Sequence, residues 1–157
     1  MKLKNDNEKN LIDKMHEYLS VFRKLSKYSS EELGNEIGVS RSTMVNFERN
    51  AENIRMSKAQ YIALRTVLEA RAEELANQDD DSLKKAIELV FYNQNYEKNK
   101  KEIKETMTTV GAVCGLAGSI SVGTLLAPVF GGVALATGLC LGIASTILKG
   151  LNEKNDN

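Results

Sequence analysis

The chain has 157 residues, a formal net charge of 0 at pH 7, one Pro and no Trp, and only 6% of its side chains are aromatic. This composition favours one modest helical domain joined to a second element. The two cysteines lack the spacing of a zinc site, and no catalytic triad, phosphate loop or acid pair occurs at a suitable spacing. We therefore expect no metal, no cofactor, no catalytic residues and no enzymatic activity.

A long helix is predicted over about residues 8–27, after a polar start that we expect to be frayed. Apolar residues recur in it at steps of three and four, so they form one stripe on the helix surface. The stripe consists of Leu11, Ile12, Met15, Tyr18, Leu19, Phe22 and Leu25. We expect it to pack under the two short helices that follow. His16 lies in the same helix, and we expect it at the surface or in a capping role.

The segment from Ser29 to Asn50 reads SSEELGNEIGVSRSTMVNFERN and predicts two short helices separated by a sharp turn at Gly38. Ser29 or Ser30 can cap the first helix, because a serine hydroxyl accepts hydrogen bonds from free backbone amides. Gly38 supplies the left-handed backbone that ends this helix. Ser40 can cap the second helix.

This arrangement is a helix-turn-helix, and the first turn of its second helix is the part that enters the DNA major groove. Its pattern resembles that of the phage-repressor and Cro-like family, also called the xenobiotic-response-element family, in which the order is roughly S-Q-E-E-L-A-x-x-x-G-V-S-R-S-T-I-x-x-x-E-R-G. The resemblance covers about residues 11–76. The matching residues are Ser29, Glu31, Glu32, Leu33, Gly38, Val39, Ser40, Arg41, Ser42, Thr43, Glu48 and Arg49, with Met44 and Phe47 at the two apolar positions.

The sequence departs from the family pattern at three positions: Ser30 replaces Gln, Gly34 replaces Ala and Asn50 replaces Gly. Gly34 keeps the small residue that close helix packing needs. The Gln that is usual in place of Ser30 braces the reading helix or contacts phosphate, and its loss leaves that contact in doubt. The resemblance also implies that Arg23 pairs with Glu48. We expect DNA contacts from Ser30, Ser40, Arg41, Ser42, Thr43, Asn46 and Arg49. The resemblance implies that the motif itself is held together by Leu33, Gly34, Gly38, Val39, Met44, Phe47, Arg23 and Glu48.

A third long helix is predicted from a Ser57 cap to about Ala76, which closes a DNA-binding domain over residues 8–76. The run NQDDDS that follows carries like charges that resist packing, so we place the domain boundary there. Residues 77–105 then form an acidic linker and an amphipathic helix beginning at Ser82. This helix either docks on the domain or pairs with its copy in a dimer.

The chain carries no charged side chain from Thr106 to Leu148, and Pro128 divides this segment into two halves of about 20 residues, enough for each to cross a bilayer. We expect a hydrophobic, membrane-inserted helical hairpin over residues 106–149 and a polar tail over 150–157. Gly111, Gly115, Gly138 and Gly142 are spaced for close helix contact in it. Flanking lysines would keep both termini on the cytoplasmic face.

These patterns predict an all-α protein: a Cro-like bundle, a linker helix and a glycine-rich hairpin. Its expected function is sequence-specific binding of double-stranded DNA as a transcriptional regulator tethered to membrane lipid through residues 106–148, as a homo-oligomer, in the simplest case a dimer. Two alternatives remain open. One is a soluble cytoplasmic dimeric repressor with a C-terminal oligomerisation segment, and the other is a membrane-active or pore-forming protein with an accessory helix-turn-helix.

Overall fold

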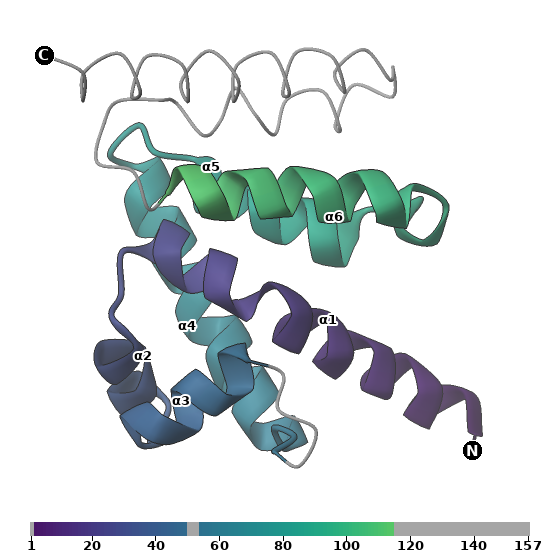
Figure 1. Ribbon diagram of the computed structural model, residues 1–157, viewed down its shortest axis with the longest axis horizontal. Coiled ribbons are helices and arrows are strands. Elements are labelled where there is room, and N and C mark those ends of the chain that lie inside the picture. Colours follow the sequence, from purple (N-terminus) through teal and green to yellow (C-terminus); the bar gives the residue numbers. More distant parts are fainter. Residues whose placement is uncertain (1, 50–53, 115–157) are drawn as a thin grey trace, which may run out of the picture.

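The computed structural model describes residues 2–49 and 54–114, and every regular element in these ranges is helical (Figure 1). The all-α prediction is therefore confirmed for this part of the chain. The elements in chain order are α1 (Lys2–Ser26), α2 (Ser30–Glu36), α3 (Arg41–Glu48), α4 (Lys58–Ala76), α5 (Ser82–Ile87), the π-helical turn η1 (Glu88–Tyr92) and α6 (Tyr96–Val113).

Serine caps mark the beginnings of α2, α3 and α4. Ser29 and Glu32 form a reciprocal capping box: the Glu32 amide donates to Ser29 Oγ at 3.1 Å, and the Ser29 amide donates to the Glu32 carboxylate at 2.7 Å. Ser40 and Ser57 accept from the amides of Thr43 and Gln60 in the same way. Of the two serines that the sequence offers for α2, Ser29 is thus the cap. These local bonds explain why the predicted helix starts agree with the structure.

α1 is the central helix of the described part of the chain. α2 and α3 lie on one side of it, α5, η1 and α6 lie on the other, and α4 crosses it and reaches α5 (Figure 1). It begins at Lys2, six residues before the predicted start, so the expectation of a frayed polar beginning is not met in the backbone. The prediction of a single stripe on α1 was also incomplete. Tyr18 and Val21 face α6, whereas His16 and Arg23 face α3.

α5 and η1 dock on the rest of the fold, which is one of the two outcomes expected for the amphipathic helix beginning at Ser82. Leu83, Ala86, Ile87, Leu89 and Val90 are buried there. The same hydrophobic core includes residues of α1, α3, α4 and α6. The domain boundary predicted at 77–82 therefore coincides with a turn but not with a break in the core, and independent folding of residues 8–76 stays a prediction.

α6 runs without interruption past Glu105 and Thr106, where the first half of the hydrophobic hairpin was expected to begin. Ile103, Met107 and Val110 follow one another at steps of four and three, so they share one side of α6, and all three are fully buried. This continuous stripe is the physical reason why residues 106–113 belong to the helical bundle here. Residues 115–157 lie outside the described part of the chain.

The turn between α2 and α3 brings two backbone segments close together at Gly34. The Val39 amide donates to the Gly34 carbonyl at 2.9 Å, and Gly38 in this turn has a φ of +72°. A Cβ atom built on Gly34 would lie 2.8 Å from the Val39 carbonyl oxygen. The alanine that is usual in the family pattern would therefore not fit this turn without a backbone shift.

We predict that Gly34→Ala lowers the free energy of unfolding by about 1–2 kcal/mol, since overpacking against a backbone oxygen outweighs the better helix propensity of Ala. Asn35→Ala is the matched control, because Asn35 is an exposed residue of the same helix. It should leave stability unchanged or slightly higher. Chemical denaturation measures both, and a Gly34→Ala variant as stable as the parent would contradict the close approach.

Candidate nucleic-acid interface

α3 has one side in the core and one side open to solvent. Met44 and Phe47 are fully buried. Ser42, Asn46 and Arg49 follow one another at steps of four and three, so they share the opposite side, where Ser42 and Arg49 are exposed and Asn46 is half-buried. Arg41 is exposed at the first residue of the helix. The structure therefore brings most of the sequence-predicted DNA contacts onto one short helix.

The hydroxyls of the first turn of α3 form a local network around the cap. Ser40 Oγ lies 2.9 Å from both Ser42 Oγ and Thr43 Oγ1. The hydroxyls of Ser42 and Thr43 are thereby both tied to the cap, and their DNA contacts stay predictions. Arg41 forms no ion pair with any residue that the structure describes, so its guanidinium is available to a ligand.

A bidentate ion pair between Arg23 and Glu48 holds the end of α3 against α1. Arg23 Nε donates to Glu48 Oε1 at 2.6 Å and Arg23 Nη2 donates to Glu48 Oε2 at 3.1 Å. The two side chains are only 19% and 11% exposed. Arg23 Nη1 also donates to the Tyr28 carbonyl at 3.1 Å. The pairing implied by the family resemblance is thus present, and it joins α1, the loop after it and α3.

Ser30 belongs to this same ion-pair cluster and does not point its hydroxyl to an open surface. Its Oγ donates to Glu48 Oε1 at 3.2 Å. The structure therefore gives Ser30 a bracing role at the beginning of α2. The direct DNA contact expected of Ser30 is not supported by this geometry, because its hydroxyl proton is already used within the chain.

His16 is a buried structural residue, a role that the sequence analysis did not predict. The expectation of a surface position was wrong, because His16 is only 3% exposed. Its Nε2 accepts from the Met56 amide at 3.1 Å, so its Nδ1 carries the proton and donates to the Phe47 carbonyl at 2.9 Å. His16 thus ties the end of α3 to the start of α4. Its spacing from Ile12 and Leu19, four and three residues, was the available signal.

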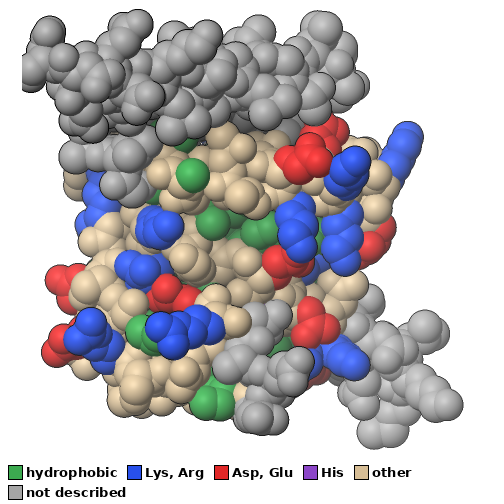
Figure 2. All heavy atoms as spheres, viewed as in Figure 1, with side chains coloured by type: hydrophobic (Ala, Val, Ile, Leu, Met, Phe, Trp, Pro, Cys, Tyr) green, Lys and Arg blue, Asp and Glu red, His purple; other side chains and the backbone are tan. Residues whose placement is uncertain are grey.

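The two helices of the motif carry exposed side chains of opposite charge. Glu31, Glu32 and Glu36 are exposed on α2, and Arg41 and Arg49 are exposed at the two ends of α3. On the face shown in Figure 2, blue and red side chains alternate over α2 and α3 and again over α6, with no broad field of one sign. This pattern favours specific side-chain contacts over strong general attraction to phosphate.

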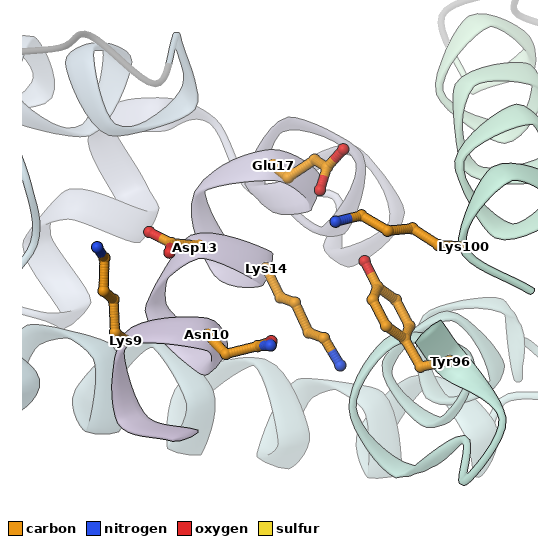
Figure 3. Close-up of a pocket in the computed structure, with 7 residues that line it drawn as sticks. All are labelled: Lys9, Asn10, Asp13, Lys14, Glu17, Tyr96 and Lys100. Atoms are coloured by element: carbon orange, nitrogen blue, oxygen red, sulfur yellow. The ribbon is translucent and has the colours of Figure 1, made fainter. Parts of the chain in front are cut away.

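A shallow hollow of about 290 Å³ lies between α1 and α6 (Figure 3). Lys14 Nζ lies 3.4 Å from the centre of the Tyr96 ring, and the Tyr96 and Tyr18 hydroxyls are 3.2 Å apart. Burial lowers the pKa of Lys14. Lysines and carboxylates alternate around the hollow, so it presents no consistent charge to a ligand and adds nothing to the interface on α3.

The remaining site predictions concern the hydrophobic segment. Gly111 lies against α1, where an added Cβ would approach Val21 Cγ2 to 3.0 Å, and its carbonyl accepts from Lys24 Nζ at 3.0 Å. Among the described residues, its close approach is therefore to α1. Gly115, Gly138 and Gly142 lie outside the described residues. Within residues 2–49 and 54–114, no helix has the length and hydropathy of a membrane span and no group of side chains suits a metal ion.

Comparison of the chain with protein-family models, with curated proteins and with solved structures found no match.

We predict that Glu48→Ala lowers the free energy of unfolding by about 2–3 kcal/mol, because it leaves the partly buried Arg23 guanidinium without its carboxylate. Glu74→Ala is the control, since it breaks the more exposed Arg71–Glu74 pair and should cost at most about 1 kcal/mol. Denaturant titration of both variants measures the difference. Equal losses of unfolding free energy in the two variants would mean that the Arg23–Glu48 pair stabilises the fold no more than an exposed ion pair does.

The capping box of α2 predicts a specific dependence of stability on acid. Hydrogen bonds from the Ser29 amide and hydroxyl hold the pKa of Glu32 below its ordinary value of 4.5. A carboxyl with a lowered pKa in the folded state stabilises the fold above its ordinary value, and this stabilisation is lost as the pH falls below it. Glu32→Gln should therefore flatten the loss of stability below pH 4.5. Glu31→Gln is the control for the lost charge, because it removes the neighbouring exposed carboxylate of the same helix turn.

Proposed function

We propose that this chain is a sequence-specific DNA-binding transcriptional regulator in which α2 and α3 form the helix-turn-helix and α3 reads the major groove. The observation that carries the proposal is the exposed side of α3, with Arg41 and Arg49 at its two ends. Its opposite side is fixed by buried residues and by the Arg23–Glu48 pair. A rigid helix with an accessible polar side is what direct reading of base edges requires.

Arg41 and Asn46 are the base-reading residues of this proposal, with Ser42 between them. Arginine pairs bidentately with guanine, and asparagine does so with adenine. Arg41 lies in the first turn of α3, which approaches the bases most closely in this motif. Asn46 lies one turn after Ser42 on the same side of α3, and its side chain forms no hydrogen bond within the described residues.

Ser40 and Arg49 position α3 through the phosphate backbone. The amides at the beginning of a helix favour an anion, and Ser40 caps α3 at this point. Arg49 follows the last residue of α3, where an exposed cation can meet the strand that borders the groove. The acidic residues of α2 limit the number of phosphates that this surface can neutralise, so we expect a modest salt dependence of binding.

Selection from a random duplex library with the full-length protein supplies the site for testing base readout. Arg41→Ala should weaken binding to that site by about 1–3 kcal/mol and relax discrimination at one base pair. Arg55→Ala is the control, because Arg55 is an exposed arginine paired with Asp13 and lies outside α3. If Arg41→Ala binds as tightly and as selectively as Arg55→Ala, α3 does not read DNA through Arg41.

The phosphate assignment has a separate test. Arg49→Ala should weaken binding to selected and random duplexes alike and reduce the slope of log affinity against log salt by about one. Affinities at four salt concentrations, measured on both duplexes, are sufficient. An unchanged slope removes Arg49 from the phosphate contacts, whereas a loss confined to the selected duplex makes it a base-reading residue.

The proposal includes a membrane tether on the cytoplasmic face, supported by the charge-free sequence from Thr106 to Leu148. The packing of α6 restricts how this tether can be built. A hairpin of two full-length helices needs residues 106–113, of which Met107 and Val110 are buried in the helical bundle and Gly111 lies against α1. The second half, Val129–Leu148, has about 20 residues and is long enough to cross a bilayer alone.

The burial of Met107 and Val110 also favours the alternative without membrane insertion, a dimeric repressor with a C-terminal oligomerisation segment. High-speed centrifugation of a lysate containing the full-length protein distinguishes the two. The tether predicts that the protein sediments with membranes and is released by detergent but not by high salt or carbonate. A monodisperse protein in the supernatant, without lipid or detergent, would support the alternative.

A further inference from the structure

Two large apolar side chains stand out from the described surface, and both lie on the same part of the fold. Ile62 on α4 is 50% exposed and Tyr92 at the end of η1 is 63% exposed. Arg65, one turn after Ile62, lies over the Tyr92 ring, with Cζ 4.9 Å from the ring centre. We name this surface the Arg65 patch; it consists of Tyr61, Ile62, Arg65, Thr66, Glu69 and Tyr92.

The charged and aromatic groups of the Arg65 patch are held in place before any partner binds. Arg65 Nε donates to Glu69 Oε1 at 2.6 Å, and Arg65 Nη1 donates to the Tyr61 hydroxyl at 3.2 Å. The Tyr92 hydroxyl donates to Glu69 Oε1 at 3.0 Å. Beneath them, the Phe91 ring lies 4.1 Å from Arg65 Cζ. Binding through such a surface orders few additional side chains, which lowers its entropic cost.

The π-helical turn is what creates the Arg65 patch. η1 brings Phe91 and Tyr92, which are adjacent in sequence, to the same guanidinium. Phe91 also stacks on the buried Phe22 ring, with the ring centres 5.8 Å apart. π-helical turns are rare, and they occur frequently at functional sites. Nothing in the DNA-binding proposal uses this element.

The composition of the Arg65 patch suits a protein interface. Tyrosine and arginine are enriched among the residues that dominate binding energy at interface centres. The Arg65 charge is balanced by Glu69 in the same chain. Covering the patch therefore leaves no unpaired charge away from water, which would otherwise oppose binding.

The neutral charge of the Arg65 patch favours a second copy of the chain as the partner. A two-fold interface brings the same surface against itself, so a patch of one sign would repel its copy, whereas this one is neutral. α4 begins with Lys58 and carries Glu73 and Glu74 near its end, and these exposed side chains pair with Glu8, Lys84 and Arg71 of the same chain. Two α4 helices that cross antiparallel near Thr66 would place the basic start of each beside the acidic end of the other.

The row of α4 that leads through the Arg65 patch has no charged side chain to hinder this approach. Ala59, Ile62, Thr66 and Ala70 are exposed and follow one another at steps of three and four, so they lie along one side of the helix. We infer that two copies of this chain associate through the Arg65 patch, with their α4 helices antiparallel. The inference goes beyond DNA binding and does not depend on it.

Association is measured without DNA, on the full-length protein in detergent micelles, by sedimentation over a concentration series. Ile62→Glu should raise the dimer dissociation constant at least about tenfold, because two added carboxylates would meet near the symmetry axis. Gln78→Glu is the control, since it adds the same charge at an exposed turn residue away from the patch. It should leave the constant unchanged. The half-exposed position of Ile62 makes its replacement compatible with folding, which circular dichroism checks.

A second variant tests the geometry without weakening the surface. In a chain with Cys114→Ser and Cys140→Ser, Thr66→Cys should give a disulfide-linked dimer on mild oxidation, and Gln78→Cys should remain monomeric. The inference is overturned if Ile62→Glu and Gln78→Glu associate equally and Thr66→Cys stays monomeric. That result would mean that copies associate elsewhere, or that another part of the same chain covers the patch. Failure of DNA binding would leave all of these outcomes unaffected.

Discussion

The ion pair between Arg23 and Glu48 is the interaction on which the arrangement of the candidate DNA-reading helix depends. It is largely withdrawn from water, it is bidentate, and it is extended by the Tyr28 carbonyl and the Ser30 hydroxyl. His16 fixes the same end of α3 from another point of α1. α3 is therefore held from its C-terminal end, which leaves its first turn, with Arg41, open to solvent.

The position of α1 between two layers has a consequence for the whole chain. One side of α1 holds α3 through His16 and Arg23, and the other holds α6 through Tyr18, Val21 and Lys24. A force or ligand that displaced α6 would act on the helix that also positions the candidate reading surface. Coupling between the C-terminal segment and DNA binding would have a direct physical route through α1.

The parts of the fold that the sequence predicts well are those set by local chemistry. Ser40 and Ser57 cap helices because each hydroxyl accepts a hydrogen bond from an amide only three residues further along the chain. Contacts between residues far apart in the sequence were harder to predict. The burial of His16 depends on partners 31 and 40 residues away. Hydropathy placed the start of a membrane span at Thr106, whereas the stripe of Ile103, Met107 and Val110 continues α6 across that point.

At the candidate site, the exposed side of α3 was predictable from periodicity. The hydrogen bond from Ser30 to Glu48 was not, because the family pattern has Gln in place of Ser30.

Hydrogen exchange of the full-length protein, with and without a duplex selected from a random library, tests the central claim most directly. Amide exchange reports which backbone segments a ligand covers or stabilises. If α3 enters the groove, exchange slows over residues 40–49 on adding the duplex and stays unchanged over α6. A chain that binds the duplex with unchanged exchange in α3, and with slower exchange elsewhere, would contradict the account.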